Sequence, residues 1–219
     1  MKKTTLALVI VMLSGMAQAA SAQGVGLGLR GGSVGFGAEG ALGLSPNLVV
    51  RGGVALMPFE FESEIDDFDF TIELPDTWYN IGVDFYPAGS FRIGGGMLFK
   101  SEGPTLTGEP IESVEIGDVF YTPEELGTLK GSLVSGDKAP YLLIGFGKHT
   151  DLGFGLFVDL GVAFLGDTEI ELNAEGGNFA NDAELRAQLD IEETRLEDDA
   201  GKYLSYYPFL SVGLRFGIS

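Results

Sequence analysis

Residues 210–218 read Leu-Ser-Val-Gly-Leu-Arg-Phe-Gly-Ile, and this stretch decides the fold because its side chains alternate strictly between two kinds. Every second side chain is large and apolar, and the positions between them hold Ser211, Arg215 and two glycines. Alternation with a period of two is typical of a β-strand whose two faces meet different surroundings. A soluble sandwich would show Lys, Glu, Thr and Ser on its second face, whereas glycine dominates here. The pattern favours apolar side chains turned to lipid and small ones turned into a narrow barrel.

The same alternation occurs seven more times along the chain. It predicts strands near residues 23–31, 34–44, 48–56, 79–85, 91–100, 141–147 and 154–162. Glycine makes up 34 of 219 residues, about twice its usual share of roughly 7%. The sequence therefore predicts an all-β fold, an eight-stranded antiparallel up-and-down transmembrane β-barrel. A soluble β-sandwich with glycine bulges remains the alternative.

The N-terminus predicts the compartment. Lys2 and Lys3 precede a short apolar run at residues 6–12, and small-x-small cleavage sites end at Ala19 and Ala22. This is the pattern of a secretory signal peptide. We expect residues 1–22 to be the signal peptide and residues 23–219 the barrel domain, located in the cell outer membrane of a Gram-negative envelope. The chain contains no Cys, which excludes disulfides, thiolate metal sites and a lipid anchor on Cys.

Acidic residues are concentrated in three windows, at residues 60–76, 102–125 and 167–199. Each window lies in a long connection, and the short turns near residues 45–47, 87–89 and 148–151 alternate with them. An even-stranded barrel with both termini in the periplasm requires this parity, with its longer loops outside. The formal net charge of −19 excludes binding to nucleic acid through phosphate contacts. The first hairpin is expected to turn at Gly31-Gly32.

Two short helices are predicted in the outer loops. One begins at Thr122, a suitable N-cap followed by Pro123 and by Glu125 three residues after the cap. The other covers residues 181–199, with leucines at helical spacing. Its apolar stripe is narrow, which favours a lid resting on the barrel rim over a partner-binding helix.

Charged residues on the glycine-rich faces are expected to meet inside the barrel, because a narrow lumen requires its charges to pair. The predicted interior network comprises Arg30, Glu39, Arg51, Asp84, Arg92, Lys100, Asp159 and Arg215. We expect Asp84 directly opposite Arg92, and Glu39 near Arg51. Arg215 is expected near Arg30 or Asp159. The alternative to an internal plug is a narrow polar path or gate.

Aromatic residues are expected in two girdles at the membrane interfaces. The predicted outer girdle comprises Phe59, Phe61, Phe68, Phe70, Trp78 and Tyr79, and the predicted periplasmic girdle comprises Phe85, Tyr86, Phe91, Phe146 and Phe154. A small hydrophobic ligand site is the alternative for the outer set.

The last strand also carries a motif. Ser211, Gly213, Phe216 and Ile218 have the spacing of the C-terminal β-signal of bacterial outer-membrane proteins, which the barrel-assembly machinery reads in that family, although Ser219 replaces the usual terminal aromatic. More broadly, the chain resembles small, mostly uncharacterised outer-membrane barrels of the OmpA-barrel and OmpW-like kind. The matching segments include residues 85–87, 120–122, 139–141, 159–162 and 206–208. The resemblance implies an eight-stranded barrel and no activity.

The expected function is a structural or surface-interaction role with acidic extracellular loops, and the alternative is a narrow, porin-like channel or transporter for small hydrophobic solutes. No enzyme activity is expected, because the single His149 lies in a predicted periplasmic turn, away from the outer face. No catalytic residue, cofactor or metal ligand is assigned. Expected partners are outer-membrane lipid and lipopolysaccharide, the barrel-assembly machinery, and divalent cations at the acidic loops, and the barrel is expected to be a monomer.

Overall fold

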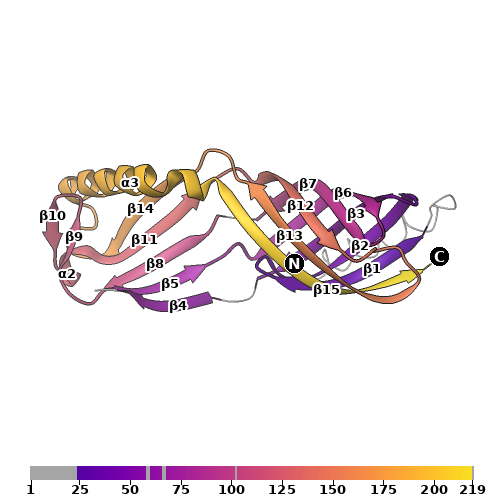
Figure 1. Ribbon diagram of the computed structural model, residues 1–219. Coiled ribbons are helices and arrows are strands. Elements are labelled where there is room, and N and C mark those ends of the chain that lie inside the picture. Colours follow the sequence, from indigo (N-terminus) through magenta and orange to yellow (C-terminus); the bar gives the residue numbers. More distant parts are fainter. Residues whose placement is uncertain (1–23, 58–59, 66–67, 102, 219) are drawn as a thin grey trace.

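The computed structural model describes residues 24–57, 60–65, 68–101 and 103–218 (Figure 1). The predicted signal peptide therefore lies outside the described residues. Eight antiparallel strands form a closed barrel in the order β1-β15-β13-β12-β7-β6-β3-β2. Their bounds are β1 Val25–Gly32, β2 Gly35–Ser45, β3 Leu48–Leu56, β6 Thr77–Ala88, β7 Phe91–Lys100, β12 Lys138–Phe146, β13 Gly153–Phe164 and β15 Tyr206–Ile218. The predicted barrel and its strand number are confirmed.

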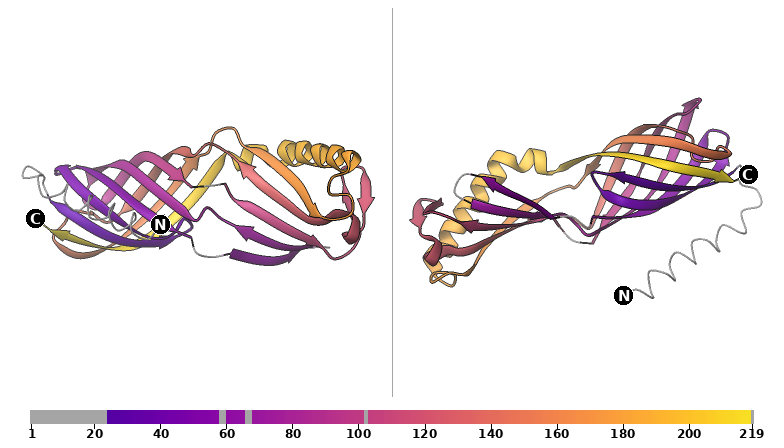
Figure 2. Two further views of the ribbon diagram at one scale, coloured as in Figure 1. Left: turned by 180° about the vertical axis from the view of Figure 1, so that it is seen from behind. Right: turned by 90° about the horizontal axis from the view of Figure 1, so that it is seen from below.

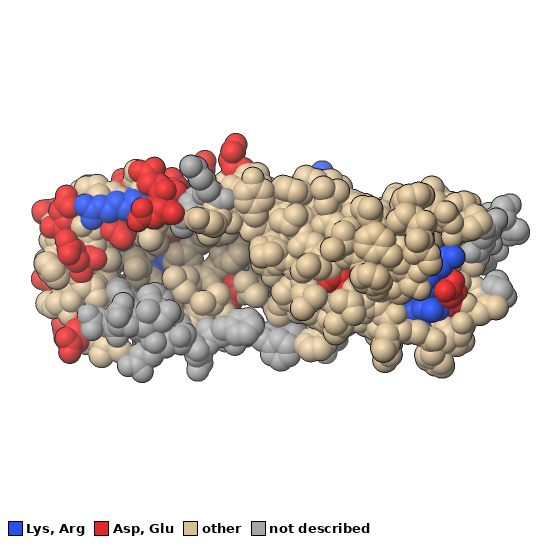
Figure 3. Space-filling view, in the orientation of Figure 1, with Lys and Arg blue, Asp and Glu red and all other residues tan. Residues whose placement is uncertain are grey.

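The barrel turns its apolar face outward. Leu156 is 72% exposed and Leu214 is 56% exposed, whereas Ser211 between the apolar positions of β15 is 2% exposed. The first and last strands close the ring, with Val25 opposite Ile218. Figure 3 shows a nearly uncharged surface over the barrel. Such a surface on a closed ring fits the hydrocarbon core of a bilayer, because a closed ring leaves no unpaired strand edge in lipid. The sandwich alternative is therefore wrong, and the expected outer-membrane location is supported.

The acidic windows are not loops but a folded extension that continues from one end of the barrel (Figure 2). Five strands form its sheet in the order β14-β11-β8-β5-β4. Their bounds are β4 Glu60–Ile65, β5 Phe68–Glu73, β8 Thr105–Pro110, β11 Gly127–Val134 and β14 Glu169–Gly176. A hairpin of β9 Val114–Ile116 and β10 Val119–Tyr121 leads to helix α2, Pro123–Leu126. The expected long connections are present, but they were not expected to contain strands, and these strands pair into a second sheet.

Helix α3, Ala183–Leu204, organises this extension. Two of its carboxylates accept hydrogen bonds from backbone N–H groups on the outer edge of β14. Glu193 accepts from Leu172 at 2.7 Å, and Glu197 accepts from Ile170 at 2.8 Å. Its apolar face packs against the sheet and the β9–β10 hairpin. The predicted helix is confirmed, with Asp182 as its N-cap. The predicted position was wrong, because the helix lies along β14, at the edge of the five-stranded sheet, and not on the barrel rim. For helix α2, the predicted capping box of Thr122 and Glu125 is present.

The extension has its own hydrophobic core, so a cavity in that core should loosen it without opening the barrel. Leu185 is 1% exposed and packs in the cluster that contains Leu126 and Leu172. We expect Leu185→Ala to cost the extension about 2–5 kcal/mol of free energy of unfolding. Limited proteolysis should cut the extension faster, while the barrel fragment keeps its folded mobility on unheated gels. Leu196→Ala is the matched control, because Leu196 lies on the same helix and is 37% exposed. Equal protease resistance of the two variants would contradict the assignment of this core.

Two local expectations are corrected. The first hairpin turns at Ser33 and Val34, because Gly31 and Gly32 both remain in strand pairing. A Cβ at Gly32 would strike the Leu210 carbonyl, so glycine serves close strand approach here rather than the turn. Val34 is 2% exposed and tucks into the barrel.

The aromatic girdles are formed only in part. Phe85, Phe146 and Phe154 are exposed on the outside of the barrel. Trp78 and Tyr86 were placed in the girdles wrongly, because each is only 2% exposed and lies inside the barrel. Phe61, Phe68 and Phe70 lie on β4 and β5 of the extension, and Phe59 lies outside the described residues. Among the described residues, no helix is long and apolar enough to cross a membrane.

Candidate functional site: the barrel interior

Six charged side chains meet in the barrel interior and form what we call the charge layer. Its members are Arg30, Glu39, Arg51, Asp84, Arg92 and Asp159, each at most 8% exposed. Arg51 is central, because it lies 3.4 Å from Glu39, 3.1 Å from Asp84 and 2.9 Å from Asp159. Arg92 contacts both Asp84, at 3.4 Å, and Asp159. Three arginines and three carboxylates therefore balance in the described part of this layer.

Glycines on the neighbouring strands let these long side chains cross the narrow interior. Asp84 does not lie directly opposite Arg92, as we expected, because its cross-strand partner is Gly94 and the register shifts between Phe85 and Ala88. A Cβ at Gly94 would strike the Asp84 carboxylate. The missing side chain therefore opens the diagonal along which Asp84 reaches Arg92. Glu39 pairs diagonally with Arg51 in the same way, since its cross-strand partner is Gly53.

Two predicted members are not brought into the charge layer. Lys100 is buried at the extension end of the barrel, where its Nζ donates to the Ser135 carbonyl at 3.3 Å. Arg215 is only partly buried and lies at the other end, where it donates to the Asp151 carbonyl and, at 3.5 Å, to the Gly153 carbonyl. Among the described residues it makes no ion pair with Asp159 and does not approach Arg30. Its expected position was wrong because the turn before β13 folds back to meet it.

The most informative correction concerns His149, which is not a surface turn residue. Residues 147–152, here called the 147–152 turn, fold into the barrel mouth, and His149 is 1% exposed. Its Nε2 lies 2.5 Å from Glu39 Oε1, and its ring packs 4.7 Å from that of Phe157. Residues 147–152 show no alternation from which an inward side chain could be predicted. A single histidine flanked by turn residues indicates an exposed position.

Three further polar residues in the interior were missed. Asn80 accepts from Arg30 at 2.8 Å, and the Tyr86 hydroxyl contacts both His149 and Arg92. Tyr141 lines the same space. Asn80 and Tyr141 occupy the second face of strands that were predicted correctly, so strict counting of alternation would have found them. The inward direction of Tyr86 was not predicted, because aromatic residues near strand ends suggest a girdle at the membrane interface.

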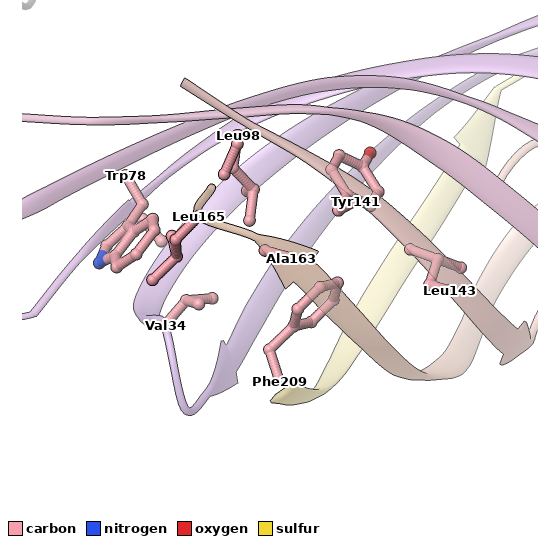
Figure 4. Packing of buried hydrophobic residues seen from close by; sticks show 10 residues of the cluster. Val34, Trp78, Leu98, Tyr141, Leu143, Ala163, Leu165 and Phe209 are labelled. Carbon is pink, nitrogen blue, oxygen red and sulfur yellow. The ribbon is translucent and has the colours of Figure 1, made fainter. Parts of the chain in front are cut away.

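A cluster of buried apolar side chains, which we call the apolar layer, packs inside the barrel (Figure 4). It is formed by Val34, Ala55, Trp78, Leu98, Ala139, Tyr141, Leu143, Ala163, Leu165 and Phe209. Trp78 stacks on Tyr207 with ring centroids 5.4 Å apart. The cavity left between the two layers is about 10 Å³, which holds no more than about one water molecule. Side chains therefore fill the part of the interior between the two layers.

The site is a network of buried charges paired with one another. The described residues contain no group of three or more His, Asp or Glu that could hold a metal ion. His149 has a carboxylate beside it but is sealed from solvent, so no substrate can reach it in this conformation. The absence of enzyme activity stays a prediction.

Comparison with known proteins finds matches among solved structures. No protein-family model matches the chain. No curated protein sequence matches it either. The crystal structure of CarO2 from Acinetobacter baumannii superimposes with a TM-score of 0.63 at 17% identity, covering 90% of this chain and 99% of that one. The crystal structure of CarO from the same organism gives a TM-score of 0.61 at 16% identity, covering 87% and 96%.

These likenesses concern the fold alone, because the identities are low. Their coverage is too large for the barrel strands by themselves, so the similarity continues into the extension. The chain therefore has the fold of a small outer-membrane barrel with an extension at one end.

Proposed function

We propose that the protein is a closed, monomeric outer-membrane barrel with a structural or surface-interaction role, and that its acidic extension stands outside the cell. The observation that carries this proposal is the doubly sealed interior, in which the charge layer and the apolar layer leave a cavity of about 10 Å³. Solute passage needs a continuous path of at least molecular width, and the buried side chains that fill both layers support a closed interior.

The lengths of the connections support this orientation. The end with short turns carries Val25 and Ile218, and the other end carries the extension. Outer-membrane barrels place short turns in the periplasm and longer segments outside. In this orientation the acidic side chains that Figure 3 shows over α3 and the β9–β10 hairpin would face the medium. Contact with lipopolysaccharide, bridged by divalent cations, is the partner chemistry that such a surface supports.

A conductance measurement tests the closed interior. We expect purified full-length protein, inserted into planar bilayers near pH 7.5, to show no discrete current steps under conditions in which a general porin shows them. Folded insertion must be verified in parallel by heat-modifiable mobility of protein recovered from liposomes. Regular steps proportional to the amount of folded protein would contradict the proposal.

The alternative function, transport of small hydrophobic solutes, is tested separately. Its motivation is the apolar layer at the extension end, where a hydrophobic solute would first meet Trp78 and Phe209. Uptake of a labelled aromatic solute into liposomes should not exceed that of protein-free liposomes. Saturable uptake without ionic conductance would favour the transporter and overturn the structural role.

A further inference from the structure

Lys100 carries a positive charge that the charge layer does not balance. It is 8% exposed at the end of β7, and its Nζ donates to the Ser135 carbonyl at 3.3 Å. No carboxylate of the described residues lies within ion-pair distance of this ammonium, although the exposed Asp137 attracts it from farther away. An ammonium has three N–H donors, so two of them have no described acceptor. Buried charges are normally paired, because an unpaired one is costly.

Trp78 of β6 lies directly opposite Lys100 and brings a second donor without a partner. The two residues are cross-strand partners, so their side chains leave the sheet on the same face. Trp78 is 2% exposed, and its indole nitrogen is buried with no described acceptor. Figure 4 shows this nitrogen on the edge of the ring that points away from the other labelled residues of the apolar layer. A buried indole N–H usually finds an acceptor, because it can only donate.

Ser135 adds a third donor to this place. Its carbonyl accepts from Lys100, and its hydroxyl oxygen is buried and has no described partner. An ammonium, an indole N–H and a hydroxyl therefore gather where the barrel joins the extension, with fewer acceptors than donors. Such a set favours an anion, because an anion accepts from several donors and also neutralises the ammonium.

We propose that Lys100 and Trp78 bind a small monovalent anion, of the size of chloride, at the end of the barrel that joins the extension. One negative charge is sufficient, because the ammonium carries a single uncompensated positive charge. A one-atom ion suits the place better than a bulky oxyanion, because both side chains are almost fully buried. The phosphate groups of lipopolysaccharide are larger and carry more charge than one ammonium balances.

Tryptophan fluorescence can measure the binding of an anion, because Trp78 is the single tryptophan of the chain. The probe is iodide, a halide that quenches indole fluorescence on contact. The full-length protein is refolded in non-ionic detergent, and the ionic strength is held constant with sodium gluconate, whose anion is bulky. We expect iodide to quench Trp78 along a saturating curve, and we expect added chloride to reverse the quenching. A tryptophan that is 2% exposed and has no anion site should be quenched only weakly and without saturation.

Two lysine substitutions separate a bound anion from general attraction of iodide to the protein. Lys100→Met keeps a long side chain and removes the charge. Its apparent affinity for iodide should fall about tenfold or more, since hydrogen bonds to charged groups are the strong ones. Lys138→Met is the matched control, because Lys138 lies at the same end of the neighbouring strand β12, is exposed, and pairs with Phe99 instead of Lys100. This variant should bind iodide as the unsubstituted protein does.

Equal iodide titrations of Lys100→Met and the unsubstituted protein would overturn the anion site, and so would an equal loss of quenching in both lysine variants. Folding of each variant is verified by heat-modifiable mobility. If Lys100→Met does not fold, competition in the unsubstituted protein decides, because quenching that chloride does not reverse would also overturn the site. Fluorescence reports the surroundings of Trp78 and not conduction, so a failure here leaves the proposed structural role unaffected.

Discussion

Arg92→Ala is expected to cause a large loss of barrel stability. Arg92 is 0% exposed and contacts Asp84, Asp159, the Gly147 carbonyl and His149. Its removal leaves the interior with one uncompensated carboxylate, and breaking a buried pair in this way costs about 3–5 kcal/mol. We expect little or no folded barrel after refolding, measured as loss of the fast-migrating band on unheated gels and as a lower urea midpoint.

Two comparisons separate charge from packing. Lys130→Ala removes an ion pair with Glu175 whose side chains are at least half exposed, so its cost should stay within about 1 kcal/mol. Adding Asp159→Asn to Arg92→Ala restores the charge balance without changing the size of the second side chain. The double variant should therefore regain part of the lost stability. If Arg92→Ala keeps its heat-modifiable band and its urea midpoint, the charge layer does not stabilise the barrel.

The barrel could be predicted from the sequence because alternation is a local property. Each strand shows it within about nine residues, and the eight strands then follow from counting. The interior charges were found by the same rule, since Glu39, Arg51 and Asp159 all occupy the glycine-rich face. The register of the strand pairs was harder to predict from the sequence. The diagonal pairing of Asp84 and Arg92 depends on a bulge between Phe85 and Ala88, which alternation does not reveal.

The extension could not be predicted because its strands pair with segments that are distant in the sequence. Residues 105–110 pair with both residues 68–73 and residues 127–134, and these partners are separated by other strands. Dense acid in the sequence suggested solvated loops. In the structure, several of those carboxylates have defined partners, as Glu193 and Glu197 do on the edge of β14. His149 was missed for a related reason, because the direction of a turn side chain depends on the glycines of strands distant in sequence.

Gly213→Leu is expected to block folding through the barrel interior rather than through recognition of the C-terminal motif. A Cβ at Gly213 would strike the Leu29 carbonyl and the Phe157 ring. Phe157 is itself 1% exposed and lies under the Arg92 guanidinium, 5.6 Å from its ring centroid, so it has no room to move aside. Overpacking of a filled interior commonly costs about 1–3 kcal/mol, and several added carbons against backbone should exceed that range. We expect failure to refold in detergent, where no assembly machinery is present, measured by heat-modifiable mobility.

Phe216→Ala is the matched substitution that separates the two roles of the motif. Phe216 is 41% exposed on the lipid-facing side, where its ring lies 4.9 Å from that of Phe154. Its removal changes the surface that an assembly factor would read and leaves the interior intact. This variant should therefore refold in detergent as the unsubstituted protein does, and accumulate less in the outer membrane of cells. If Gly213→Leu refolds in detergent and fails only in cells, Gly213 acts as part of a recognition signal. If both variants fail in detergent, the whole last strand is needed for closure against β1. The packing role of the motif and its recognition role are then not separable by these substitutions.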